Sequence, residues 1–336
     1  METIFITIEG WPTGPVRGTE VRRRWRTRPG LFRSPFCSPF RAPALPVIAI
    51  CLLCPAALTG CGTSGSAHPG AVAVVASTEV WGSVARAVAG RHIAVKSILT
   101  GAESDPHSYQ ASPADAAALA DADLVVYNGG GYDPWVDRVL AGHPRIPAVD
   151  AYSLLGPVSE TPDEHVFYNL TVAKAVAGGI AERLAVIDPA NSVEYRANAA
   201  EFGRGADAIA NSERAIATSY PATGVIATEP VVHYLLAASG LINRTPAAFA
   251  QANENDNDPA PADLVSVLDL INHREVSALL INPQTATATT ADLRAAARKA
   301  GVPVTEVSET LPSGSDYLTW QRNTVSQLTA ALRSGR

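Results

Sequence analysis

Between residues 71 and 188, segments with the period of a β-strand alternate with segments with the period of an α-helix. Three short segments are predicted to be strands. Residues 71–76 and 123–128 are apolar runs rich in β-branched residues, and in 92–99 apolar and polar residues alternate. Between them, 80–89 has helical spacing, and a second helix is predicted from Pro113 to about Ala122 with Ser112 as its N-cap. Because strands separated by helices form parallel sheets with helices on their faces, this part is predicted to be an α/β lobe.

Residues 188–220 break the alternation. They carry apolar residues at roughly helical intervals, many Ala and no strand pattern, and 28 helical residues would extend about 42 Å. Strand patterns then return at 224–228, 277–282 and 302–307, with helical patterns at 292–300 and 317–334. The predicted fold class is α/β, with two lobes, each a mostly parallel sheet flanked by helices, joined by one long helix. The predicted boundaries are 71–188 for the N-terminal lobe, 189–218 for the linking helix and 219–336 for the C-terminal lobe.

The first 60 residues have a different composition. They contain eight Arg and no Lys, and a twelve-residue apolar stretch at 47–58 leads to Leu-Thr-Gly-Cys at 58–61. A basic segment, a short apolar core and small residues before a cleavage point predict an export signal over 1–60, and twelve residues are too few to span a bilayer. The tetrad resembles a bacterial lipobox, in which Cys61 would carry the lipid and 61–70 would form a flexible tether. The alternative is an ordinary signal peptide in which Cys61 is coincidental.

The charge and cysteine content of the chain argue against several classes of protein. The net charge of −6 argues against a nucleic-acid-binding protein, which normally shows a basic stripe. A mean hydropathy of +0.08 argues against a polytopic membrane protein. All four Cys lie at or before position 61, so the body of the chain must be stabilised by core burial without disulfides. We find neither a Walker-type phosphate loop nor a Gly-x-Ser-x-Gly motif, and 129–131 (Gly-Gly-Gly) indicates a tight turn.

Four polar residues lie on loops beside predicted strands or helices: His107, His165, Glu229 and Asp316. In open α/β sheets, ligands bind at the loops beyond the carboxyl ends of strands, so these loops can converge on one cleft. Imidazole suits Zn²⁺, carboxylate suits harder ions such as Mn²⁺, and two carboxylates neutralise a dication. The spacing alone also fits four unrelated loop residues. His233, one helical turn beyond Glu229, is a candidate additional ligand or a residue that packs in the following helix.

Five short motifs resemble, in order, those of metal-binding lipoproteins of the zinc/manganese ABC importer family, the solute-binding proteins of the cluster A-I type. The matching segments are 105–109 with 112–115, 122–129, 164–169, 228–234 and 316–317. The resemblance implies His107, His165, Glu229 and Asp316 as the four metal ligands and the helix near 190–218 as a rigid connector. Many zinc-binding members carry a third His where Glu229 stands, and zinc-specialised members have a His-rich loop that this chain lacks. The ligand set therefore resembles the manganese branch.

The function implied is that of an extracytoplasmic receptor, anchored to the bacterial cell membrane through a lipid on Cys61. It would capture Zn²⁺ or Mn²⁺ between its lobes and deliver the ion to an ABC permease with its ATPase. We expect a monomer that binds no nucleic acid. We also expect no catalysis, because a closed shell of four protein ligands leaves no position for an activated water. Two alternatives remain: a secreted metallohydrolase with Glu164 as its general base, and a chelate- or siderophore-binding protein of the same architecture. Residues 253–258, which are rich in Asn and Asp, are interpreted as a solvated linker and not as a calcium loop.

Overall fold

The computed structural model describes residues 72–101, 106, 108–156, 163–255 and 257–335. Contacts along the chain divide it into Met1–Ser64 and Gly65–Arg336, and every described residue belongs to the second unit. The predicted export signal, Cys61, the tether and His107 lie outside the described residues. Among the residues that are described, none of the helices is long and apolar enough to cross a membrane.

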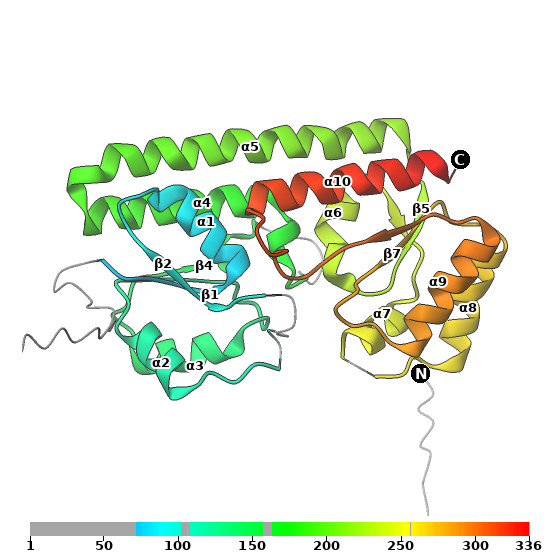
Figure 1. The fold of residues 1–336 in the computed structure, drawn as a ribbon, viewed down its shortest axis with the longest axis horizontal. Coiled ribbons are helices and arrows are strands. Elements are labelled where there is room, and N and C mark those ends of the chain that lie inside the picture. Colours follow the sequence, from blue (N-terminus) through cyan, green and yellow to red (C-terminus); the bar gives the residue numbers. More distant parts are fainter. Residues whose placement is uncertain (1–71, 102–105, 107, 157–162, 256, 336) are drawn as a thin grey trace, which may run out of the picture. The chain divides into compact units, whose positions relative to one another are not determined.

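The first lobe is built on a four-stranded parallel sheet of order β2-β1-β3-β4 (Figure 1). Its strands are β1 (Val74–Thr78), β2 (Val95–Leu99), β3 (Leu124–Tyr127) and β4 (Ala148–Asp150). Its helices are α1 (Glu79–Ala89), α2 (Pro113–Ala120), α3 (Pro134–Gly142) and α4 (Leu170–Ile187). Every residue of β1 and β3 is buried, which explains the apolar sequence of β3 and of the first three residues of β1. Ser112 caps α2 as predicted, because its side chain accepts a hydrogen bond from the Asp115 amide.

The second lobe repeats this plan with a parallel sheet of order β6-β5-β7-β8. The strands are β5 (Gly224–Ala227), β6 (Ile242–Asn243), β7 (Leu279–Ile281) and β8 (Val304–Glu306). The helices are α6 (His233–Ala238), α7 (Ala247–Glu254), α8 (Pro261–Asn272) and α9 (Ala288–Ala300). Short 3₁₀ turns occupy Tyr152–Leu154, Val166–Tyr168, Pro189–Asn191 and Pro230–Val232. The predicted α/β class with two parallel sheets is confirmed.

The predicted long helix is α5 (Ser192–Ser219), which has 28 residues. It packs against α1 and α4 of the first lobe and against α6 and the C-terminal helix α10 (Tyr317–Ser334). At Gly205, α5 and α10 approach each other closely, because a Cβ there would lie 2.6 Å from Leu318 Cδ1. The absence of a side chain at Gly205 therefore lets α10 pack closely here, although glycine has a low helix propensity.

One carboxylate is buried in this helix. Glu213 is 3% exposed, and its Oε1 has no hydrogen-bond partner among the described residues. Burial raises the pKa of Glu213 from 4.5 to about 7, an effect that the neighbouring Arg214 guanidinium only partly offsets. Between these two pKa values the folded protein binds more protons than the unfolded chain, so stability falls as the pH rises through that window.

We therefore predict that Glu213→Gln, which cannot ionise, is more stable than the parent at pH 8 by up to about 3 kcal/mol. At pH 5 the difference should shrink to less than about 1 kcal/mol, because the parent carboxyl is then protonated in the fold. Urea denaturation at both pH values measures this, with exposed Glu201→Gln as the control. An equal gain at pH 5 and pH 8 would contradict a role for ionisation.

Candidate metal centre

His165 occupies the loop that leads into α4. The helix starts at Leu170 because Asn169 caps it, its side chain accepting hydrogen bonds from the amides of Thr171 and Val172. The 3₁₀ turn Val166–Tyr168 lies between the cap and His165, and all three of its residues are buried. The imidazole is completely buried, in edge contact with the rings of Tyr132 and Phe167.

Asp163 sets the orientation of this imidazole. Its Oδ1 lies 2.8 Å from His165 Nδ1 and also accepts a hydrogen bond of 2.9 Å from the His165 amide. An ionised carboxylate can only accept, so Nδ1 carries the proton and donates it. The other ring nitrogen, Nε2, therefore faces the groups on the opposite side of the ring, as in metal-binding histidines whose far nitrogen is held by a carboxylate.

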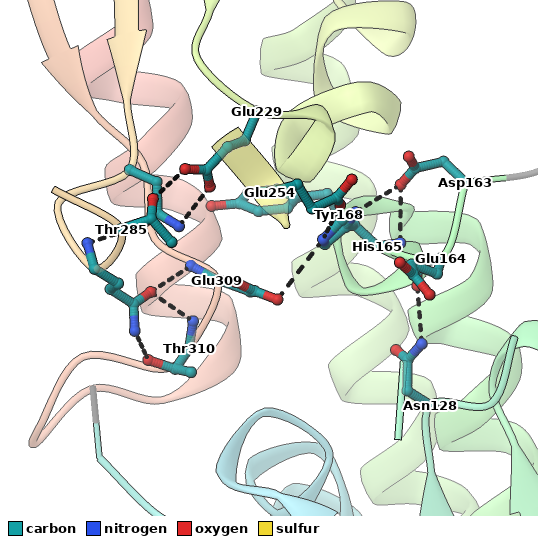
Figure 2. Close-up of polar contacts among 12 residues, drawn as sticks. Asn128, Asp163, Glu164, His165, Tyr168, Glu229, Glu254, Thr285, Glu309 and Thr310 are labelled. Atoms are coloured by element: carbon teal, nitrogen blue, oxygen red, sulfur yellow. Dashed lines mark hydrogen bonds and ion pairs between the residues drawn. The ribbon is translucent and has the colours of Figure 1, made fainter. Parts of the chain in front are cut away.

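Three glutamates of the second lobe lie on that side (Figure 2). Glu254 Oε1 is 3.5 Å and Glu309 Oε1 is 3.7 Å from His165 Nε2. Glu229 is 3% exposed and interacts electrostatically with both Glu309 and His165. Glu229 and Glu309 follow β5 and β8, so parallel-sheet topology places both at one edge of the lobe. Glu254 ends α7, which a hydrogen bond from Asn253 to the Thr228 carbonyl holds against the end of β5.

Glu229 is held by neutral donors. Asn282 Nδ2 donates to its Oε2 at 2.9 Å, and the Thr285 hydroxyl donates to its Oε1. Burial raises the pKa of Glu229, and the nearby Glu309 carboxylate raises it further, while these two hydrogen bonds lower it. The site thus concentrates negative charge in a place with little water, which favours a cation.

In the absence of a metal, the imidazole supplies the compensating charge. Burial lowers the pKa of His165, but the hydrogen bond to Asp163 and the charges of the Asp163 and Glu309 carboxylates outweigh burial and raise it from 6.5 to about 10. A divalent ion that binds Nε2 must therefore displace a proton.

The donor set fits a divalent metal. Two donors at about 2.1 Å from a tetrahedral ion lie roughly 3.4 Å apart, slightly less than the separations from Nε2 to Glu254 and Glu309. Within the described ranges, no three His, Cys, Asp or Glu side chains are already arranged to hold a metal ion. Ligation therefore requires a small inward movement of these carboxylates.

The structure brings Glu309, and not Asp316, beside His165. Asp316 is exposed and caps α10, its carboxylate accepting 2.8 Å hydrogen bonds from the amide and the hydroxyl of Thr319. This is the ordinary role of an Asp before a helix. Glu309 directly follows the last strand pattern, so the rule that ligands bind beyond the carboxyl ends of strands could have identified it. Sequence reasoning also missed Glu254, which lies in the segment interpreted as a solvated linker.

His233 begins α6 and is exposed. With Glu229 and Gln251 it lines a cavity of about 210 Å³. Its role as an additional ligand stays a prediction, as does that of His107, which lies outside the described residues.

Both lobes hold the loop that carries His165. From the first lobe, Asn128 Nδ2 donates 2.8 Å to the Glu164 carbonyl. From the second lobe, Tyr234 Oη donates 2.7 Å to the Asp163 carbonyl, and from α10 Tyr317 Oη donates 2.6 Å to that of Phe167. The position of Nε2 is therefore fixed relative to the strand ends of the second lobe.

The sequence matches a family model and several known proteins. A model of the family described as zinc-uptake complex component A, periplasmic, matches residues 74–331. The manganese-binding lipoprotein MntA of Bacillus subtilis is 27% identical over 236 residues, which cover 67% of this chain and 76% of the relative. The manganese ABC transporter substrate-binding lipoprotein PsaA of Streptococcus pneumoniae is 22% identical over 236 residues, covering 66% of this chain and 74% of PsaA.

Solved structures show the same fold. The periplasmic zinc-binding protein TroA of Treponema pallidum matches with a TM-score of 0.65 and 20% identity, covering 78% of this chain and 99% of TroA. The solute-binding protein FpvC of Pseudomonas aeruginosa, in complex with Mn²⁺, matches with a TM-score of 0.65 and 20% identity over 79% of this chain and 100% of FpvC.

The contact between Asp163 and His165 generates a prediction. Asp163→Ala removes the acceptor that holds Nδ1–H, so we expect the affinity for Zn²⁺ to fall about 10–100-fold, as for other carboxylates that orient a ligating histidine. Asp163→Asn keeps an acceptor oxygen and should fall between this variant and the parent. Competition against a chromophoric chelator measures the affinities, with exposed Asp207→Ala as the control. If Asp163→Ala binds like the parent, Asp163 does not position the ring.

Proposed function

The chain belongs to the periplasmic zinc-uptake complex component A family, and on that premise we propose that it is the metal receptor of an ABC importer. It binds Zn²⁺ or Mn²⁺ outside the cytoplasm and delivers the ion to the permease, which works with an ATPase. The observation that carries the proposal is the buried His165 imidazole, oriented by Asp163 and facing Glu229 and Glu309.

The proposed ligands are His165, Glu229 and Glu309, together with His107, the histidine that the resemblance to the family implies. Glu309 thus takes the place that sequence analysis gave to Asp316. Two imidazoles and two carboxylates neutralise the charge of a dication and suit both metals.

We propose that the protein transports and does not catalyse. A shell made of four protein ligands leaves no open position for an activated water, which a catalytic zinc site keeps. The carboxylate of Glu164, the candidate general base of a metallohydrolase, lies near the turn at Gly131. A Cβ at Gly131 would lie 3.2 Å from Glu164 Oε2. The comparisons support neither the hydrolase nor the chelate-binding alternative.

The ligand set is tested by metal titration of single variants. Glu309→Ala should weaken Zn²⁺ and Mn²⁺ binding at least tenfold, because it removes a direct ligand. Asp316→Ala should leave both affinities within about threefold of the parent and lower the free energy of unfolding by about 0.5–2 kcal/mol, the usual effect of losing a helix cap. Isothermal titration and urea denaturation give the two quantities. The reverse result, in which only Asp316→Ala loses metal, would restore the ligand assigned from sequence.

The proposed location rests on Cys61. We propose that this residue carries a lipid and that the mature protein is a monomer tethered to the outer face of the cell membrane. Cys61→Ala should move the protein from the membrane fraction to the soluble fraction when cells are lysed without detergent. Unchanged fractionation, checked by immunoblot, would exclude the anchor while leaving the metal site untouched.

A further inference from the structure

We infer that Glu254 is a specificity-determining residue that raises the affinity of the site for Mn²⁺ relative to Zn²⁺. This inference rests on the proposed function, because it concerns the choice of ion at the same site. The family resemblance assigns no role to Glu254, and the sequence around it predicts only a solvated segment.

Glu254 is placed by its neighbours. The preceding residue, Asn253, is buried, and its Nδ2 donates 3.0 Å to the carbonyl of Thr228. Thr228 in turn precedes Glu229, so one hydrogen bond ties the end of α7 to the end of β5. This contact therefore positions Glu254 and Glu229 relative to each other in the site.

The Glu254 carboxylate is also oriented. Its Oε2 accepts a 2.9 Å hydrogen bond from Gln251 Nε2, while its Oε1 lies 3.5 Å from His165 Nε2. The side chain is only 10% exposed. An acidic side chain held this way on a short helix is directed at the imidazole and not at solvent.

The donor count gives the consequence. Glu229, Glu254 and Glu309 offer up to six oxygens beside the imidazole nitrogens of the proposed ligand set, whereas Zn²⁺ in proteins is usually satisfied by four donors. Carboxylate oxygens suit Mn²⁺, so an additional carboxylate ligand should raise the affinity for Mn²⁺, while Zn²⁺ does not need that ligand. Two carboxylates already neutralise a dication, so the third adds selectivity more than charge balance.

The competing explanation is that Glu254 only pairs with a protonated His165. In that case removal of its charge would not weaken metal binding, because the carboxylate would have to leave the imidazole before a metal could bind.

The test compares Mn²⁺ and Zn²⁺ affinities of the parent with those of Glu254→Gln, which keeps the size and shape of the side chain. We expect Mn²⁺ affinity to fall at least tenfold and Zn²⁺ affinity to fall less than threefold. Glu254→Asp keeps a carboxylate, so its Mn²⁺-to-Zn²⁺ affinity ratio should lie nearer to that of the parent. Exposed Glu201→Gln is the matched control and should change neither affinity.

Co²⁺ provides a second readout that does not depend on affinity. The visible bands of bound Co²⁺ are weak in five- or six-coordinate sites and intense in tetrahedral ones. We expect weak bands in the parent and intense bands in Glu254→Gln.

The outcomes separate the two levels of the argument. If Glu254→Gln loses both metals by the same factor, or neither, with an unchanged Co²⁺ spectrum, this inference is wrong and the proposed function stands. If the parent binds neither Mn²⁺ nor Zn²⁺, the proposed function fails and the inference fails with it.

Discussion

The burial of His165 among carboxylates is the constraint on which the rest of the structure depends. Negative groups can be held this close in a site with little water only if a positive charge accompanies them. In the metal-free protein that charge is the imidazolium, whose pKa is raised to about 10 by Asp163 and Glu309 against the effect of burial. A bound dication would take over the same role, so proton and metal compete for one position and the carboxylates are compensated in either state.

This competition requires that the imidazole stay in place when the charge changes. The loop that carries it is held by side chains of both lobes through its main-chain carbonyls, which remain acceptors whatever ion is bound. Helix α10 adds a further tie, because the Tyr317 amide donates to Ser83 of α1 while its hydroxyl reaches the loop. The glutamates lie at strand ends and at one helix end, so the small movement that ligation requires falls on them.

Much of the fold could be predicted from sequence because its signals are local. A buried parallel strand such as β3 is a continuous apolar run in the sequence. The capping residue Ser112 and the long helical pattern of α5 are likewise visible without tertiary information. The site could be predicted less fully from the sequence. Residues 253–258 are polar and look solvated, yet Asn253 and Glu254 are drawn into the lobe by contacts with β5 and His165, which are far away in the sequence.

The choice between Glu309 and Asp316 shows where sequence reasoning stops. Both are acidic residues after the last strand, and composition cannot separate them. Their helical context can: Asp316 immediately precedes α10, where an Asp side chain is favoured as a cap for unpaired amides, and its oxygens are engaged by Thr319. A carboxylate committed to a helix end must give up those hydrogen bonds before it can bind a metal. Glu309 does not precede a helix, and its position three residues after β8 brings it to the edge of the sheet where the other strand-end carboxylate, Glu229, lies.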